Sequence, residues 1–262
     1  MDIKEYKVVA ENGKRNHPWE YARCVVVNSI LKKHLTSADS HPDVLDRGCG
    51  DIFFVNDFCR RHPHFHPIAI DTAFDTEIMA SLHTQHPELD IDLYNDVTQV
   101  NNCRQASLVL LLDVLEHIEK DADFLHLVTS QAYITHDTVF MITVPAFQSL
   151  YVQRDKWLGH YRRYSRKQLC SMVSNAGLRV TESGYFFTFP ALVRRFQKMM
   201  ERSAAKPEAQ QEGIGNWNKG TLATTAFKAA LLADYYLFRL FHLLGIKVPG
   251  LSTYVVCRPD KQ

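Results

Sequence analysis

The stretch "DVLDRGCGDIFF", residues 43–54, joins a short apolar strand to a glycine-containing turn and the start of a helix. Gly48 and Gly50 follow the acidic Asp46, and Ile52 stands where a third glycine would complete a ligand-binding turn. Glycine lets the backbone turn sharply and approach a ligand closely. The stretch matches neither the dinucleotide fingerprint G-x-G-x-x-G, whose last glycine is missing, nor a P-loop. Alone, it fits a ligand site and a tight strand-to-helix corner equally well.

Strand-like and helix-like segments alternate around this turn. The predicted strands are seven mostly apolar segments: 43–46, 66–71, 91–97, 108–112, 138–145, 178–187 and 252–259. Amphipathic helices are predicted between them and before the first: 15–35, 53–62, 76–86, 121–133 and 165–177, the last with Ser165 as N-cap and Gly177 as its end. Apolar strands separated by helices predict an α/β fold with a mostly parallel sheet covered on both faces.

Residues 190–250 form an insertion between the last two predicted strands, where a hairpin turn would be enough. We predict a basic amphipathic helix over 191–206 and a long apolar helix over 221–245. Four charged or ionisable residues interrupt the second helix and argue against a transmembrane span: Lys228, Asp234, Arg239 and His242. A core or dimer helix, a lid and a membrane-surface element all remain open as roles for the insertion.

The composition is typical of one soluble globular domain. The chain has 262 residues, which we treat as a single domain, 1–262, with an N-terminal helical cover over 1–40. Its formal net charge of +1 gives no indication of a nucleic-acid partner. The six cysteines form no C-x-x-C pair, and the N-terminal residues have no apolar secretion signal, so we expect a cytoplasmic protein.

Each of the first four predicted strands ends at or near an acidic residue: Asp46, Asp71, Asp96 and Asp113. Ligands of such sheets bind beyond the carboxyl ends of the strands. A carboxylate after the second strand can accept hydrogen bonds from ribose hydroxyls, and one after the third can face an adenine amino group. This much negative charge disfavours a pyrophosphate, but it suits a nucleoside that carries a cationic centre, such as a sulfonium.

At this point the sequence resembles the class I S-adenosylmethionine-dependent methyltransferases, over roughly residues 40–185. The resemblance rests on the order and spacing of "VLDRGCGD", "AID", "ND", "LLLDVLEHI" and "MITVPAF", followed by "DKWLGHYRRYSRKQLCSMVSNAGL". It implies a Rossmann-like seven-stranded sheet and S-adenosylmethionine as cofactor.

The resemblance also implies a cofactor site built from the N-terminal helix and the first four strand ends: Trp19, Arg23, Asp46, Gly48, Cys49, Gly50, Asp71, Asp96, Val97, Leu112 and Asp113. The glycine turn would hold the methionine part, Asp71 the ribose, and Asp96 with Val97 the adenine. Leu112 and Asp113 would lie beneath the methionine and the sulfonium. For the tryptophan of the N-terminal helix, an ordinary core contact is an equal alternative.

Ile52 departs from the family pattern, because many members have a third glycine there. A β-branched residue does not easily adopt a positive φ. If the position is helical, the isoleucine costs little and packs beneath the cofactor; if it is not, the pocket is narrowed. Since the other residues of the turn are present, we expect a working cofactor site.

The segment "GHYRRY", residues 159–164, follows the fifth strand and faces the same edge of the sheet. We predict His117, His160 and Tyr161 as catalytic residues, with a histidine as general base. Three further residues are predicted to bind the acceptor, the arginines by clamping an acidic group: Arg162, Arg163 and Tyr164. A solvated basic turn before a helix is the alternative.

"DVLEHI" places Asp113, Glu116 and His117 at i, i+3 and i+4, which would bring them onto one face of a helix. With His160 they could bind a divalent cation, in an arrangement similar to the metal site of small-RNA 2′-O-methyltransferases and of some ubiquinone-pathway O-methyltransferases. Our main interpretation includes no metal, because the aspartate has a shorter reach than the glutamate of that pattern.

We therefore predict a methyltransferase that acts on a small-molecule or carrier- or lipid-linked acceptor, in secondary-metabolite biosynthesis of the aryl-polyene kind or in polysaccharide or lipid biosynthesis. The alternative is a catalytically silent S-adenosylmethionine-binding scaffold that acts through its insertion. A nucleic-acid substrate is not expected. Peripheral membrane contact and a homodimer remain open.

Overall fold

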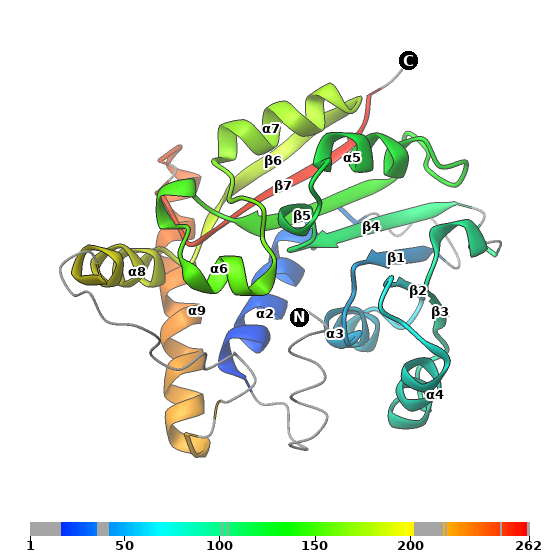
Figure 1. The fold of residues 1–262 in the computed structure, drawn as a ribbon, viewed down its shortest axis with the longest axis horizontal. Helices are drawn as coiled ribbons and strands as arrows, with labels where there is room; N and C mark the ends of the chain where they lie inside the picture. The colour runs from blue at the N-terminus through cyan, green and yellow to red at the C-terminus, as the bar shows by residue number, and fades with distance from the viewer. Residues whose placement is uncertain are drawn as a thin grey trace.

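The computed structural model describes residues 17–35, 42–100, 102–103, 105–201, 217, 219–246 and 248–260. Seven strands form one sheet in the order β3-β2-β1-β4-β5-β7-β6 (Figure 1). The strands are β1 (Asp43–Arg47), β2 (His66–Ile70), β3 (Asp92–Tyr94), β4 (Ala106–Leu112), β5 (Val139–Pro145), β6 (Leu178–Phe186) and β7 (Ser252–Pro259). β7 runs antiparallel to both of its neighbours, and the pairs formed by β1 to β5 are parallel. The predicted α/β fold with a mostly parallel sheet is confirmed.

Helices cover both faces of this sheet, with α2 and α3 on one side and α5 and α7 on the other (Figure 1). The helices are α2 (Pro18–Leu31), α3 (Phe53–Arg61), α4 (Thr76–Gln85), α5 (Asp121–Thr129), α6 (Gln153–Leu158), α7 (Arg166–Asn175), α8 (Thr188–Glu201) and α9 (Thr221–Leu243). Three 3₁₀ turns connect them to the strands: η1 (Val97–Gln99), η2 (Leu115–His117) and η3 (Gln148–Leu150).

The central strand β4 shows why the sheet needs two helical layers. Leu108 and Leu110 belong to the core cluster under α2 and α3, whereas Val109 and Leu111 belong to the cluster under α5 and α7. Successive side chains of a strand point to opposite faces, so a strand whose residues 108–112 are all apolar must be covered on both sides. The apolar run in the sequence therefore specifies the layered fold.

The third strand is shorter than predicted, because Asp96 does not belong to it. Its Oδ1 accepts hydrogen bonds from the Thr98 backbone N–H, at 2.8 Å, and the Thr98 hydroxyl, at 2.9 Å. The carboxylate caps η1, and a side chain that caps its own local turn ends the extended strand. The predicted N-cap Ser165 and the terminating Gly177 of α7 are confirmed, since Ser165 forms a capping box and Gly177 has a φ of 78°.

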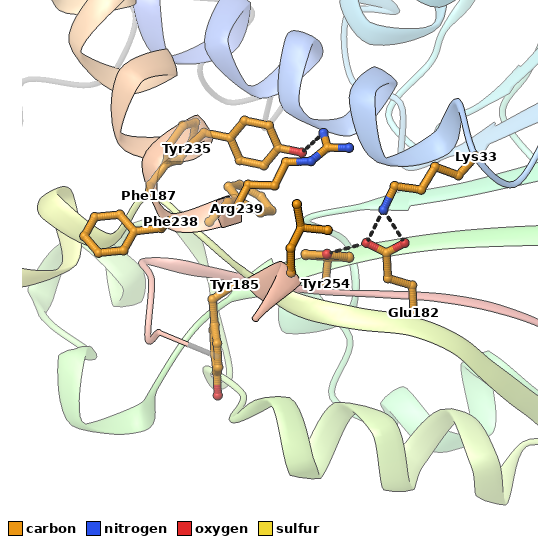
Figure 2. A pocket seen from close by; sticks show the side chains of 10 residues that line it. Lys33, Glu182, Tyr185, Phe187, Tyr235, Phe238, Arg239 and Tyr254 are labelled. Atoms are coloured by element: carbon orange, nitrogen blue, oxygen red, sulfur yellow. Dashed lines mark hydrogen bonds and ion pairs between the residues drawn. The ribbon is translucent and has the colours of Figure 1, made fainter. Parts of the chain in front are cut away.

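The insertion forms two helices, α8 and α9, as predicted, with part of the connection between them outside the described residues. α9 packs along α2 and against β6 (Figure 1). Figure 2 shows that Tyr254 and Lys33 meet the carboxylate of Glu182 beneath α9, where Arg239 donates to the hydroxyl of Tyr235. These groups line a hollow of about 420 Å³ and bind one another, so we assign them to anchoring α9.

No described helix is long and apolar enough to cross a membrane.

Asp234 explains how a charge is tolerated inside the apolar α9. Its side chain is buried, and its two carboxylate oxygens accept hydrogen bonds from the backbone N–H groups of Thr188, at 2.9 Å, and Phe189, at 2.7 Å. These donors belong to the first turn of α8, where backbone N–H groups lack partners within the helix. Asp234 therefore acts as a cap for another helix and ties α8 to α9.

Replacing Asp234 by alanine should loosen α8 selectively. Loss of a helix cap of this kind costs about 1–2 kcal/mol. Hydrogen exchange followed by mass spectrometry should show faster exchange in the first turn of α8 in Asp234→Ala, with α4 unchanged. Asp75→Ala is the matched control, because Asp75 caps α4 through Ile78 N at 2.8 Å and should affect only that helix. Unchanged exchange in α8 would refute this role of Asp234.

Candidate functional site

The carboxyl edge of the sheet concentrates backbone strain. Among the described residues, the non-glycine residues with positive φ are Ile52, Asp113, Phe147 and Phe187. Each of them follows the carboxyl end of a strand: β1, β4, β5 or β6. Left-handed conformations of bulky residues cost roughly 1–3 kcal/mol each, and they collect at functional sites where the surrounding structure enforces them. This edge is where the sequence predicts the ligand site.

The turn after β1 is held by its glycines and by Asp71. Gly48 has a φ of 72°, and a Cβ atom there would lie 2.7 Å from Val114 Cγ2. Gly50 has a φ of 59°, and its N–H donates to Asp71 Oδ2 at 2.9 Å. The other oxygen, Oδ1, accepts from Ala73 N at 3.0 Å. The carboxylate at the end of β2 therefore reaches back to the glycine turn.

Ile52 adopts the conformation that a third glycine would take. Its φ is 56° and its ψ is 8°, at the N-cap of α3, and its side chain is completely buried. The structure thus resolves the alternatives left by the sequence: the position is left-handed, and the isoleucine bears the strain. Burial of an isoleucine side chain contributes about 2–5 kcal/mol relative to alanine, which exceeds the cost of the backbone conformation. The residue is retained by packing.

This balance predicts an unusual order of stabilities at position 52. Ile52→Gly and Ile52→Ala should both be less stable than the parent, but the glycine variant should be the more stable of the two by about 1 kcal/mol, because only glycine adopts a positive φ freely. Val55, buried in the right-handed α3, is the control: there alanine should be more stable than glycine by about 1 kcal/mol. Urea unfolding measures both pairs, and the same order at the two positions would contradict a left-handed Ile52.

Arg23 ties α2 to the end of β4. Its guanidinium forms an ion pair with the Asp113 carboxylate and lies 3.8 Å from Glu20 Oε2. Burial alone would lower the pKa of Arg23, but Glu20 and Asp113 outweigh burial and raise it, so the side chain is a buried cation. Asp113 also accepts a hydrogen bond from the Thr143 hydroxyl at 2.9 Å. The predicted helical cover is thus fixed over the site by charge.

A pocket of about 270 Å³, including its open mouth, lies under this helix. Its lining combines residues of α2, the glycine turn, the start of α3 and β4: Glu20, Arg23, Asp46, Gly48, Cys49, Asp51, Phe53, Phe54 and Leu112. Three carboxyl groups thus meet one guanidinium. Burial raises the pKa of Asp46 to about 7, because its anion is poorly solvated. A cationic ligand would offset that penalty.

The pocket also contains an orphaned donor. The Nε of Arg23 is buried and has no hydrogen-bond partner among the described residues. Buried polar atoms are almost always hydrogen-bonded, so an unpaired donor at a pocket wall indicates a missing acceptor. An amino-acid carboxylate offers such an acceptor, and the acidic groups opposite offer partners for a cation.

The predicted cofactor residues separate into two groups. Five of them line the pocket: Arg23, Asp46, Gly48, Cys49 and Leu112. Three more stabilise its wall: Gly50 and Asp71 through their mutual hydrogen bond, and Asp113 through its ion pair with Arg23.

The remaining three lie apart from the pocket. Asp96 is exposed and caps η1, and Val97 packs against the core on the α5 side. Trp19 packs against Phe187, with ring centroids 4.4 Å apart, which confirms the core contact.

A second cluster lies beyond β4 and β5, where the acceptor is expected. Glu116, His117 and His160 each offer one possible metal-ligand atom, and these three atoms lie within 4.8 Å of one another. The two imidazole rings meet edge to face, with their centroids 4.6 Å apart. Glu116 is completely buried, and neither of its carboxyl oxygens has a hydrogen-bond partner among the described residues. Burial, followed by the nearby Asp113, raises the pKa of Glu116 well above its usual range.

Asp113 does not join this cluster, although its spacing in the sequence predicted that it would. Leu115–His117 is a 3₁₀ turn, so the α-helical spacing does not apply. Asp113 itself has a φ of 58° and points to Arg23. The predicted set of four metal-ligand candidates is therefore reduced to Glu116, His117 and His160.

Asp155 organises the acceptor side. It is buried, its Oδ1 lies 3.1 Å from His160 Nδ1, and it accepts hydrogen bonds from Arg163 at 2.8 Å and from Val152 N at 2.8 Å. Burial opposes ionisation, but the bonds from His160 and Arg163 prevail and lower the pKa of Asp155 to about 2. As a carboxylate it accepts a hydrogen bond from the Nδ1–H of His160, which leaves Nε2 as the ring nitrogen with a free lone pair.

The "RRY" residues of this loop hold it in place. Arg162 pairs with Asp121 at 2.9 Å, and Arg163 pairs with Asp155 at 2.7 Å. The buried Tyr164 donates through its hydroxyl to Asp121 Oδ2 at 2.7 Å. Their charged and polar groups thus form contacts within the protein that hold the loop, and binding of the acceptor by these three residues stays a prediction.

Tyr161 differs from these neighbours. Its side chain is half exposed, and its backbone N–H donates to the Glu116 carbonyl at 2.7 Å. Its catalytic role stays a prediction.

Sequence reasoning did not single out Glu20, Asp51 or Asp155 as site residues. Glu20 lies within "HPWE-x-x-R" and Asp51 directly follows the second glycine, so their positions beside predicted residues were an available signal. Asp155 lies five residues before His160 in the chain and comes from α6, a helix that was not predicted. No spacing rule connects these two residues.

No model of a protein family matches the chain. No curated protein sequence matches it either. Solved structures do. A protein from Galdieria sulphuraria assigned as a sarcosine dimethylglycine methyltransferase is similar over 91% of this chain and 85% of its own, with 13% identity and a TM-score of 0.56. Coclaurine N-methyltransferase, bound to N-methylheliamine and SAH, is similar over 89% of this chain and 70% of its own, with 11% identity and a TM-score of 0.51.

The [4+2]-cyclase SpnF is similar over 93% of this chain and 83% of its own, with 14% identity and a TM-score of 0.57. The fold is that of the S-adenosylmethionine-dependent methyltransferases of class I. Because the likeness also extends to a cyclase, the fold alone does not assign the reaction.

Proposed function

We propose that this chain is an S-adenosylmethionine-dependent methyltransferase whose acceptor is a small molecule or a group carried on a lipid or other carrier. The observation that carries the proposal is the pocket at the glycine turn, where three carboxyl groups face the buried Arg23 with its orphaned Nε. A zwitterionic amino acid with an added cationic centre matches this set of charges. The methyltransferase fold and its position at the carboxyl edge support the same ligand.

Different pocket residues would bind different parts of the cofactor. Arg23 offers its unpaired N–H to a carboxylate, and the glycine turn permits close approach of the backbone. Asp71 offers carboxylate oxygens to hydroxyl groups at the neighbouring strand end. When bound, the cofactor supplies an electrophilic methyl group on a sulfonium. The chain's own contribution is to hold that group in line with the acceptor and to exclude water, which α2 does by lying over the pocket.

His160 is the group best placed to accept a proton from the acceptor. Asp155 binds its Nδ1 and is itself held by Arg163, so the ring orientation is determined by three paired groups. The free Nε2 can remove a proton from a hydroxyl or ammonium group that attacks the methyl carbon. His117, packed against this ring, orients the acceptor in the same scheme.

Binding of S-adenosylmethionine and S-adenosylhomocysteine tests the cofactor assignment directly. Isothermal calorimetry should detect both ligands with the parent protein, and Asp71→Ala should weaken both by about 1–3 kcal/mol, because it removes a charged acceptor. Asp137→Ala is the control, since that exposed carboxylate pairs with His136 just before β5, at the opposite edge of the sheet. Absence of binding to the parent would overturn the proposal.

Cofactor binding alone is also expected of a catalytically silent S-adenosylmethionine-binding scaffold. Formation of S-adenosylhomocysteine with cell extract as the source of acceptor distinguishes the two: turnover supports an enzyme, and turnover that is lost in His160→Ala while binding persists supports the proposed base. Binding of the cofactor without turnover in any extract fraction supports the scaffold.

The cluster of Glu116, His117 and His160 favours a second role for the same site. A buried carboxyl group without partners beside two imidazoles can hold a divalent cation through one oxygen and two nitrogens. A cation there would pair with the buried carboxylate of Glu116 and would orient an acceptor hydroxyl. In this version, the residues that position His160 also position a metal ligand.

Glu116→Gln separates the two versions. If the cluster holds a cation, calorimetry with Mn²⁺ or Zn²⁺ should show one site in the parent, and the glutamine variant should weaken it roughly 10-fold or more. If the cluster works without metal, burial already disfavours the charged form of Glu116, so the glutamine should leave stability and turnover nearly unchanged. His66→Ala, at the opposite edge of the sheet beside Asp43 and Asp92, is the control. Turnover that survives EDTA with no metal bound removes the metal version.

A further inference from the structure

Helix α8 exposes its apolar side to solvent. The five residues of this side, which we call the α8 stripe, are each at least 40% exposed, with Phe189 at 65% and Phe196 at 57%: Phe189, Leu192, Val193, Phe196 and Met199. Their spacing places them along one side of the helix. A helix at a protein surface normally turns such a side toward the core, so the stripe is an apolar face without a described partner.

The polar side of α8 faces the protein instead. Ala191 is buried, and Lys198 Nζ donates to the carbonyl oxygens of Ser149, at 2.6 Å, and Tyr151, at 2.7 Å. At the other end, Asp234 holds the first turn of the helix. These bonds fix the rotation of α8, so the exposure of the stripe is a consequence of specific polar contacts.

The charge of α8 is biased toward positive. The helix contains Arg194, Arg195 and Lys198 against the single acid Glu201, in a chain whose formal net charge is only +1. An amphipathic helix with large apolar residues on one side and basic residues beside them is suited to lie in the interface of a bilayer that contains anionic lipids. α9 adds exposed leucines at helical spacing: Leu237, Leu240 and Leu244.

We propose that the α8 stripe docks onto a membrane surface that carries anionic lipids. The apolar residues enter the boundary between headgroups and acyl chains, while Arg195, which is exposed at the flank of the stripe, remains at the level of the phosphates. The helix lies on the membrane and does not cross it.

A second copy of the chain fits this face less well. In a symmetric pairing of two stripes, residues near the two-fold axis meet their own copies. Arg194 and Arg195 lie at the middle of α8, which spans Thr188–Glu201, so a pairing centred on the stripe would bring like charges together. An anionic surface instead neutralises them, which is why charge favours the bilayer.

Docking here would bring the acceptor side of the site to the membrane. Lys198 binds the Tyr151 carbonyl, and the Tyr151 hydroxyl donates to the His160 carbonyl at 2.6 Å. These two hydrogen bonds connect α8 to the backbone of the proposed base. If the proposed methyl transfer holds, the acceptor class is therefore lipid-linked; this consequence rests on the proposed function, whereas docking does not.

Co-sedimentation with vesicles tests docking without cofactor or acceptor. The parent protein should sediment with vesicles of phosphatidylcholine containing phosphatidylglycerol, and much less with phosphatidylcholine alone or at high salt. Phe196→Asp should reduce binding by roughly tenfold or more, since it withdraws a large apolar side chain and adds a negative charge. Arg195→Glu should weaken binding to the anionic vesicles only. The matched control is Leu127→Asp, at an exposed leucine on α5, which should bind as the parent does.

Three outcomes would overturn docking. The first is a parent protein that binds no vesicles. The second is a parent dimer, seen by light scattering, that Phe196→Asp dissociates, because the stripe is then an interface between copies. The third is a large fall in the unfolding midpoint of the Phe196→Asp monomer, which would show that the chain itself covers the stripe. Failure of methyl transfer with intact vesicle binding would affect the proposed function alone.

Discussion

The partly buried ion pair between Arg23 and Asp113 is the interaction on which the site depends. The buried guanidinium of Arg23 must be paired, because a charge without water or a partner is strongly destabilising. Arg23 can satisfy this requirement only where Asp113 ends β4 and Glu20 lies one helical turn away. The position of α2 over the carboxyl edge follows from this, and α2 in turn encloses the pocket. The interaction also brings a cation to a site that would otherwise contain only carboxyl groups, so that it can bind a ligand of mixed charge.

Strain and burial are balanced at the same edge. Ile52 and Asp113 adopt left-handed conformations beside the pocket, yet they are held by different means. Ile52 is held by complete burial in the core, whereas Asp113 is held by Arg23 and by the Thr143 hydroxyl. A turn of three glycines would reach the same shape without strain and without packing. This chain therefore stabilises its ligand turn through the core under α2 and α3, where the buried Ile52 takes the place of a third glycine.

Much of the fold could be predicted from the sequence because its signals are local. Apolar strands need cover on both faces, and Ser165 caps the next helix through its own neighbours. The acidic strand ends were predictable for the same reason. Asp96 is the exception, because its carboxylate accepts a hydrogen bond from the Thr98 backbone and the residue lies outside the strand. The cap that Asp234 provides for α8 could not be predicted, because it joins two helices through a tertiary contact that no spacing encodes. Asp155 and His160 lie only five residues apart, but their pairing depends on the short helix α6, which the sequence did not predict. The direction of the α8 stripe is a further case, since amphipathicity specifies two faces of a helix but not which of them meets the protein.

The two halves of the site differ in what holds them, and this difference bears on their function. The cofactor side is built on the sheet itself, from β1, β2 and β4, and its shape is tied to the core. The acceptor side is built on segments outside the core, where Arg163, Asp155, His160, Tyr151 and Lys198 form a continuous series of polar contacts that ends in α8. A displacement of α8 would thus be transmitted to the backbone of His160, but it would leave the glycine turn and Asp71 in place. If the proposed docking and methyl transfer hold, binding of the cofactor and presentation of the acceptor are mechanically separate, which suits a site with one ligand from water and the other from a membrane.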